Sequence, residues 1–230
     1  MPRTARASRG GICTHVINRG NARARVFHNE TDYREFLKLM DAACERLPMR
    51  VLAYCLMPNH FHLVLWPLGD GDLSRWMQWL STSQVRRHHR RHGTDGHLWQ
   101  GRFKAFPIQQ DEHLLTVLRY VERNPLRAKL VARAEDWPWS SLSAAGPARP
   151  LRLHPGPLLR PARWCDWVNA RDDPVELAAL RTSVIRGAPW GGRSWAERTA
   201  ERLGLQASLR PRGRPPKERV GDKRLRKKRK

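Results

Sequence analysis

The chain has 230 residues, and 44 lysines and arginines against 21 acidic residues give it a formal net charge of +23. Such an excess indicates a polyanionic partner, and nucleic acid is the expected one. No apolar run is long enough to cross a bilayer and the N-terminal residues lack the apolar core of a signal peptide, so we expect a cytoplasmic protein without a membrane partner. The four scattered cysteines form no CxxC pair, which argues against a disulfide framework or a zinc ribbon.

The first half of the chain alternates predicted strands and helices. Residues 12–18 (ICTHVIN) are rich in β-branched residues and predict a strand. From Thr31 onward, apolar residues recur at helical spacing, which predicts a helix with Thr31 or Asp32 as its N-cap. Residues 49–68 hold two apolar runs on either side of Met57-Pro58-Asn59, which predicts a β-hairpin.

The next elements continue this alternation. Residues 72–91 predict a second helix with a strongly basic end, and residues 104–109 predict a fourth strand at a sheet edge, because Pro107 cannot donate a ladder hydrogen bond. Asp111 is the expected N-cap of a third helix, which should end near Asn124 because Pro125 follows. This order predicts an α+β fold, a ferredoxin-like antiparallel sheet palm covered by helices.

The composition divides the chain into three parts. We expect a catalytic domain over residues 1–147 and a small helical C-terminal extension over 148–208, with helical stretches near 174–186 and 193–203. The last part, residues 209–230, is a basic tail that we expect to be disordered without a partner.

Four side chains in this pattern suggest metal and phosphate chemistry. In the hairpin, period-two alternation sends His60 and His62 to one face and Phe61 into the core. On the third helix, Tyr120 and Asn124 are four residues apart and are expected to face away from the apolar stripe. Two imidazoles and one amide oxygen are enough protein ligands for a divalent ion, which would help a phenol attack a phosphate. Each feature alone is more often structural: histidines on a solvated sheet face, or a tyrosine at an interface.

The segments MPNHFHLVL and YVERNPLRA, in this order and separation, resemble the HUH tyrosine transposases, and specifically the REP-associated tyrosine transposases. THVINRGNARARVFHNETDYREFL, LWQGRFKAFPI and NPLRAKLVARAEDWPWSS extend the resemblance over roughly residues 10–145. It implies that His60, His62 and Asn124 bind the metal and that Tyr120 is the nucleophile. Related insertion-sequence transposases carry glutamine where Asn124 stands, a departure that keeps the amide oxygen.

The resemblance also implies a reaction. Tyr120 attacks a phosphodiester of single-stranded or hairpin DNA, leaving a 5′-phosphotyrosine and a free 3′-hydroxyl, and strand joining is the reverse. The cofactor would be Mg²⁺ or Mn²⁺, and no nucleotide cofactor is needed.

Basic and aromatic residues outside this site are interpreted as DNA contacts. An alternation of ring and cation near residue 100 is typical of single-strand grooves, although Trp99 has an equal chance of being core. Pro211-Arg212-Gly213-Arg214-Pro215 is similar to an AT-hook, whose Arg-Gly-Arg lies in the minor groove. The predicted contacts are Arg19, Arg23, Arg25, Arg86, Arg87, Arg90, Arg91, Trp99, Arg102, Lys104, Arg212 and Arg214.

Two alternatives stay open at this stage. One is a non-catalytic nucleic-acid-binding protein on the same scaffold, and the other is a relaxase-type or replication-initiator HUH nuclease. Metal-dependent cleavage separates the first from a transposase, and the lack of a helicase segment speaks against a replication protein. The sequence does not distinguish a monomer from a homodimer, or a mobile role from a domesticated one. In either role we expect the protein in the bacterial cytoplasm, associated with the nucleoid.

Overall fold

A computed structural model describes residues 9–143 and 151–210. A four-stranded antiparallel sheet lies at its centre, in the order β2-β3-β1-β4. The strands are β1 (Thr14–Arg19), β2 (Met49–Met57), β3 (His60–Pro67) and β4 (Lys104–Pro107). Register pairs Ile17 with His62 and Tyr54 with Leu63. This order is that of a ferredoxin-like sheet, so the predicted α+β fold is confirmed, with β4 and its Pro107 at an edge.

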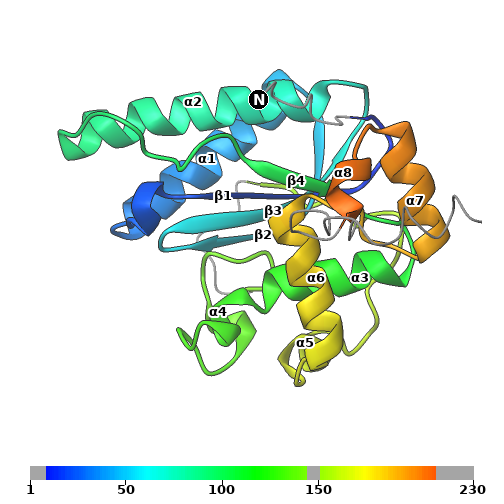
Figure 1. Ribbon diagram of the computed structural model, residues 1–230. Helices are drawn as coiled ribbons and strands as arrows, with labels where there is room; N and C mark the ends of the chain where they lie inside the picture. The colour runs from blue at the N-terminus through cyan, green and yellow to red at the C-terminus, as the bar shows by residue number, and fades with distance from the viewer. Residues whose placement is uncertain (1–8, 144–150, 211–230) are drawn as a thin grey trace, which may run out of the picture.

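Two long helices cover one face of the sheet, α1 (Glu30–Arg46) and α2 (Asp72–His92) (Figure 1). Phe36 and Trp76 from these helices pack against Val16, Phe61 and Leu63 from the strands, which forms the first hydrophobic core. The N-cap of α1 is Asn29 rather than Thr31 or Asp32. Asp32 is instead the N3 residue of a capping box, in which its carboxylate accepts from the backbone upstream.

The other face of the sheet is covered by α3 (Glu112–Glu122) (Figure 1). Asp111 caps this helix as predicted, and its side chain accepts from the His113 N–H at 3.0 Å. The helix ends before Pro125, and a short helix, α4 (Asn124–Arg127), follows at once. The second core lies between α3 and the sheet, with Val64 and Phe106 from the strands against Val117 and Val121 of α3.

The residues after 150 add to this second core. They form α5 (Trp164–Asn169), α6 (Pro174–Arg186), α7 (Arg193–Arg202) and α8 (Gln206–Leu209), and two 3₁₀ turns, η1 (Asn21–Arg23) and η2 (Ala134–Asp136), precede them in the chain. Trp164, Val168 and Leu180 pack into the core beside α3. The helices expected near 174–186 and 193–203 are therefore present. Among the described residues, no helix is long and apolar enough to span a membrane.

One buried carboxylate ties the extension to α3. Glu122 is 1% exposed and accepts hydrogen bonds from Ser141 Oγ at 2.7 Å, Trp164 Nε1 at 2.6 Å and Arg160 Nη2 at 3.2 Å. The carboxylate thus neutralises a half-buried guanidinium and satisfies an indole N–H. Loss of one partner of such a pair leaves the other buried and unpaired, which is costly.

We therefore expect Glu122→Ala to lower the free energy of unfolding by about 3 kcal/mol or more. Urea unfolding followed by tryptophan fluorescence measures this. Glu201→Ala, at an exposed position of α7, is the control and should change stability by less than about 0.5 kcal/mol. Equal stabilities for the two variants would mean that the Glu122 contacts do not hold the extension in place.

Candidate functional site

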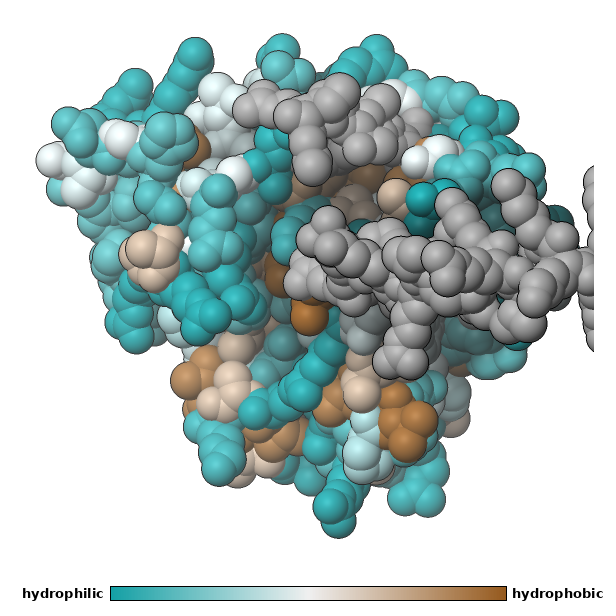
Figure 2. All heavy atoms as spheres, viewed as in Figure 1, coloured by the Kyte–Doolittle hydropathy of each residue, from teal (hydrophilic) through white to brown (hydrophobic). Residues whose placement is uncertain are grey.

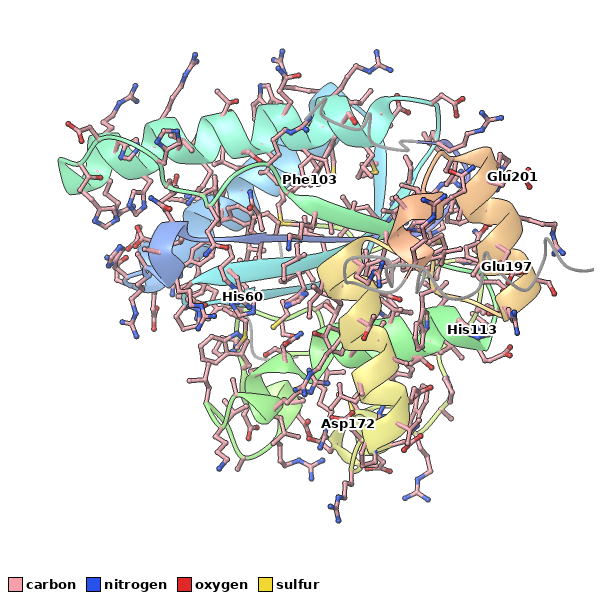
Figure 3. All side chains as sticks on the ribbon, viewed as in Figure 1. His60, Phe103, His113, Asp172, Glu197 and Glu201 are labelled. Atoms are coloured by element: carbon pink, nitrogen blue, oxygen red, sulfur yellow. The ribbon has the colours of Figure 1, made fainter. Side chains whose placement is uncertain are left out.

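The candidate site lies on the sheet face that α3 covers, where β3 begins. His60 and His62 point to this face with ring centroids 5.1 Å apart, while Phe61 packs into the first core on the other side. The predicted shared face is confirmed. Figure 3 labels His60 at the end of the sheet near α4. His62 is only 2% exposed, so this half of the site is buried and does not lie on a solvated sheet surface.

Tyr120 lies directly over these histidines. Its ring centroid is 5.7 Å from that of His62, and the ring is 9% exposed as part of the second core. The expectation that Tyr120 faces away from the core contact of its helix is therefore wrong. Val117, Tyr120, Val121 and Asn124 follow the spacing i, i+3, i+4, i+7, so the tyrosine shares the sheet-facing stripe. The sequence analysis thus assigned the ring to the wrong side of the helix. The structure places the ring near His62.

The Arg127 side chain places a positive charge next to Tyr120. The Arg127 guanidinium lies over the phenol ring at 4.6 Å from its centroid, and Asp172 holds this guanidinium with an Oδ2 to Nε distance of 3.3 Å. The same carboxylate binds Arg119 and Arg123, at 3.4 and 3.1 Å. Burial raises the pKa of Tyr120, and Arg127 is the largest opposing influence. A positive charge at this place favours the phenolate.

Asn124 begins α4, one turn after Tyr120. Its Nδ2 donates to the carbonyls of Tyr120 and Val121, at 3.1 and 3.3 Å. These bonds use the amide nitrogen, and Oδ1 accepts a long hydrogen bond from Arg127 Nη1 at 3.5 Å. The amide nitrogen therefore faces the helix carbonyls, and Oδ1 is the atom of this side chain that could serve as a metal ligand.

Sequence reasoning missed Arg127 and Asp172, described above, and also His15 in β1. Its Nε2 shares a hydrogen bond of 2.8 Å with Nδ1 of His62, and its ring also stacks beside Phe106 at 4.7 Å. The hydrogen bond occupies Nδ1 of His62, just as the Asn59 side chain occupies Nδ1 of His60 at 2.7 Å. Both rings are held through Nδ1, which leaves Nε2 for a ligand. Strand alternation in residues 12–18 was a signal that could have found His15.

The three histidines are neutral at physiological pH. Burial lowers the pKa of His15 to about 3 and that of His60 to about 4, and burial together with the neighbouring imidazoles lowers the pKa of His62 well below its usual 6.5. Metal ions bind the unprotonated imidazole. Two neutral imidazoles held through Nδ1 and one amide oxygen are therefore donors of the type that a divalent cation accepts.

These pKa values also predict how stability depends on pH. His15 takes a proton near pH 6.5 when unfolded but only near pH 3 when folded, so acid favours the unfolded chain throughout this window. From pH 7 to pH 5 this one residue should lower the free energy of unfolding by about 2 kcal/mol. The difference between the urea midpoints at the two pH values should be smaller in His15→Phe than in the parent, while His60 and His62 keep their own contributions. An unchanged pH dependence in that variant would contradict the buried neutral state.

The predicted DNA contacts fall in three places. Arg19, Arg102 and Lys104 line one cavity of about 320 Å³ between the end of β1 and α6. Arg23 and Arg25 are exposed in the segment after β1. The exposed cations of the second helix, which Figure 2 draws among hydrophilic side chains, follow its C-terminal half: Arg86, Arg87, Arg90 and Arg91.

The other predicted contacts have different outcomes. Trp99 is 6% exposed and meets Phe61 edge to face at 5.2 Å, so the structure places its ring in the first core, at the wall of a cavity that Arg102 also lines. Its burial follows from the bridge that joins it to Gly20 at the end of β1. Arg212 and Arg214 lie outside the described residues.

The fold of the described residues is that of a tyrosine transposase. A solved structure of a REP-associated tyrosine transposase bound to a REP hairpin matches with a TM-score of 0.50 and 22% identity, covering 61% of this chain and 81% of that chain. In sequence, a Haemophilus influenzae protein named as a REP-associated tyrosine transposase is 30% identical over 122 residues, which cover 48% of this chain and 69% of that protein.

The family model described as "Transposase IS200 like" matches residues 9–124, about half of the chain and the part that contains His60, His62, Tyr120 and Asn124. The chain belongs to this family of IS200-like transposases. The resemblance to REP-associated tyrosine transposases is thereby confirmed.

Proposed function

We propose that this protein cleaves and rejoins single-stranded or hairpin-forming repeat DNA, with Tyr120 as the nucleophile. The observation that carries the proposal is the position of the Tyr120 ring, 5.7 Å from His62 on the face that also carries His60, beneath the guanidinium of Arg127. Family membership supports DNA cleavage and joining as the activity.

His60, His62 and Asn124 would hold one divalent ion, Mg²⁺ or Mn²⁺. When bound, the ion supplies Lewis-acid polarisation of the scissile phosphate. His15 and Asn59 keep the two imidazoles oriented through their Nδ1 atoms. For His62 to present a lone pair at Nε2, its Nδ1–H must donate to His15, so His15 serves as an acceptor.

Tyr120 then attacks in line. Its oxygen forms a bond to phosphorus while the bond from phosphorus to the 3′ oxygen breaks, and the 3′ oxygen takes a proton as the tyrosine loses its own. The products are a 5′-phosphotyrosine and a free 3′-hydroxyl, and attack by a 3′-hydroxyl on the adduct rejoins the strand. Arg127, held by Asp172, favours the charged phenolate against the effect of burial. No nucleotide cofactor enters this cycle, because the adduct conserves the phosphodiester energy.

The substrate proposal rests on charge and on a structural relative. The net charge is +23, and the solved relative is bound to a REP hairpin. Arg19, Arg102 and Lys104 would contact phosphates at the cavity they share, and the basic half of α2 would extend the surface. A bacterial protein with this substrate would act in the cytoplasm, at the nucleoid.

A library of hairpin-bearing single-stranded DNA, incubated with the protein and Mn²⁺, tests this function. We expect DNA to remain covalently attached to protein after denaturation, and sequencing of the recovered strands gives the hairpin and the cleavage position. DNA that binds without any metal-dependent adduct would favour the non-catalytic binding protein instead.

Removal of residues 210–230 tests the role of the basic tail. These residues hold twelve lysines and arginines against two acids, so deletion should weaken DNA binding and flatten the plot of log affinity against log salt, while adduct formation survives. Fluorescence anisotropy over a salt series measures both quantities. An unchanged slope would assign the tail to something other than DNA.

A further inference from the structure

Three histidines meet on the opposite side of the sheet from Tyr120, at the C-terminal end of α2. His88 and His92 are one turn apart on this helix, and His28 reaches them from the segment between η1 and α1. Each offers a ring nitrogen, and the three nitrogens lie within 4.8 Å of one another. Figure 1 draws the segment after β1 next to this end of α2, and the His28 and His92 rings are 4.8 Å apart.

A buried carboxylate orients this cluster. Asp32 Oδ1 lies 3.1 Å from Nε2 of His92, while its Oδ2 accepts from the backbone N–H of His28 at 2.8 Å. Asp32 is itself fixed in the capping box of α1 and is 5% exposed. Nε2 of His92 is thereby engaged and Nδ1 is left for a ligand, which is the carboxylate–histidine arrangement that supports metal ligands in proteins.

The surroundings keep the imidazoles available. Burial and the adjacent imidazoles lower the pKa of His88 to about 4, so its ring is neutral at physiological pH. Two of the nearby cations are engaged with carboxylates: Arg91 lies 3.5 Å from Asp32, and Arg87 pairs with Glu35. His89 is excluded as a ligand, because Thr94 and the Gly96 carbonyl occupy its two nitrogens at 2.9 and 3.1 Å.

We propose that His28, His88 and His92 form a second metal site, which binds Zn²⁺ or a similar transition-metal ion. Three nitrogen ligands are typical of zinc, whereas Mg²⁺ prefers oxygen. Tetrahedral zinc with nitrogens at about 2.0–2.1 Å needs them about 3.3 Å apart, so nitrogens that lie within 4.8 Å of one another must close by up to about 1.5 Å, which the exposed His28 permits. The fourth position is open to water.

The site would fasten two DNA-binding segments to each other. His28 follows the segment that carries Arg23 and Arg25, and His88 and His92 lie among the cations of α2. A bound ion would cross-link the loop to the helix and stabilise the folded chain by mass action. This consequence depends on the proposed DNA surface, whereas metal binding itself does not.

The test uses the full chain without an affinity tag, in a His60→Ala/His62→Ala background that removes the other candidate site. Titration with Zn²⁺ by calorimetry should give one equivalent bound, and Co²⁺ should give the visible absorption of four-coordinate cobalt. The thermal midpoint should rise with Zn²⁺ and should not respond to Mg²⁺ at the same concentration.

Adding His28→Ala should weaken Zn²⁺ binding at least about tenfold and reduce the thermal shift, and adding His92→Gln should do the same. His28 is exposed, so its variant is expected to keep its fold, which the metal-free thermal midpoint verifies. His97→Ala, also exposed, is the matched control and should bind as the background does. Absence of stoichiometric Zn²⁺ binding in the background, or binding that His28→Ala and His92→Gln leave unchanged, would overturn the proposal. Loss of DNA cleavage alone bears on Tyr120 and not on this site.

Discussion

Tyr120→Phe is expected to abolish the covalent DNA adduct while DNA affinity stays nearly unchanged. The substitution removes one hydroxyl and keeps the ring, its contact with His62 and its stacking on Arg127. Because the phenol oxygen forms the bond to phosphorus, adduct formation should fall at least about a thousandfold, as it does when a covalent nucleophile is removed. Denaturing gels with labelled hairpin DNA measure the adduct, and anisotropy measures the affinity.

The other two tyrosines provide matched controls. Tyr33 and Tyr54 are both buried in the first core, so their phenylalanine variants should keep both the adduct and the affinity. An adduct that persists in Tyr120→Phe, or cleavage at normal rate that leaves an ordinary hydrolytic 5′ end, would replace the tyrosine mechanism by a nuclease in which a metal-bound water attacks.

The features that the sequence could predict depend on local rules. Strand alternation predicted that His60 and His62 share one face. Asp111 and Pro125 marked the start and the end of α3. These signals act over a few residues, where backbone geometry alone decides the outcome. The same rule, applied to β1, predicts that His15 and Ile17 share one strand face, but the contact of His15 with His62 depends on the register between β1 and β3.

The orientation of Tyr120 shows where local rules fail. Its helix is packed on two sides, against the sheet and against α5 and α6, so even Arg119 and Glu122 are buried. On such a helix the apolar stripe is not the only face that turns inward. The prediction that Tyr120 faces away from the core was therefore wrong. For Trp99 the alternation of rings and cations left core and DNA contact equally open, and the structure shows that the ring turns inward.

Contacts between residues that are distant in the sequence could not be predicted, for a different reason. Asp172 pairs with Arg127 across 45 residues, and His28 meets His92 from the far side of a β-hairpin and two helices. Nothing in a single sequence encodes which distant charges become neighbours, since this follows from how α1, α2 and the C-terminal helices pack. The electrostatics of Tyr120 therefore had to come from the structure.

His60→Ala/His62→Ala is expected to end metal-dependent cleavage and to leave most of the DNA affinity. Two of the three proposed ligands disappear, so Mn²⁺ binding and adduct formation should each fall at least about a hundredfold. DNA binding rests on phosphate contacts from lysines and arginines, and Arg19, Arg102 and Lys104 are all retained. Calorimetry with Mn²⁺, gel assays for the adduct and anisotropy with hairpin DNA measure the three quantities.

Asn124 allows a finer test of the same site. Asn124→Gln keeps an amide oxygen and should retain measurable cleavage, whereas Asn124→Leu removes the ligand and should lower it toward the level of the double histidine variant. Because the Asn124 amide also donates to two helix carbonyls, thermal midpoints must accompany both variants. If Asn124→Leu folds normally and cleaves at the parental rate, the amide is not a ligand and its place must be taken by another oxygen. If His60→Ala/His62→Ala itself still forms the adduct with Mn²⁺, the ion is not held at this face, and the proximity of Tyr120 to His62 is a matter of packing alone.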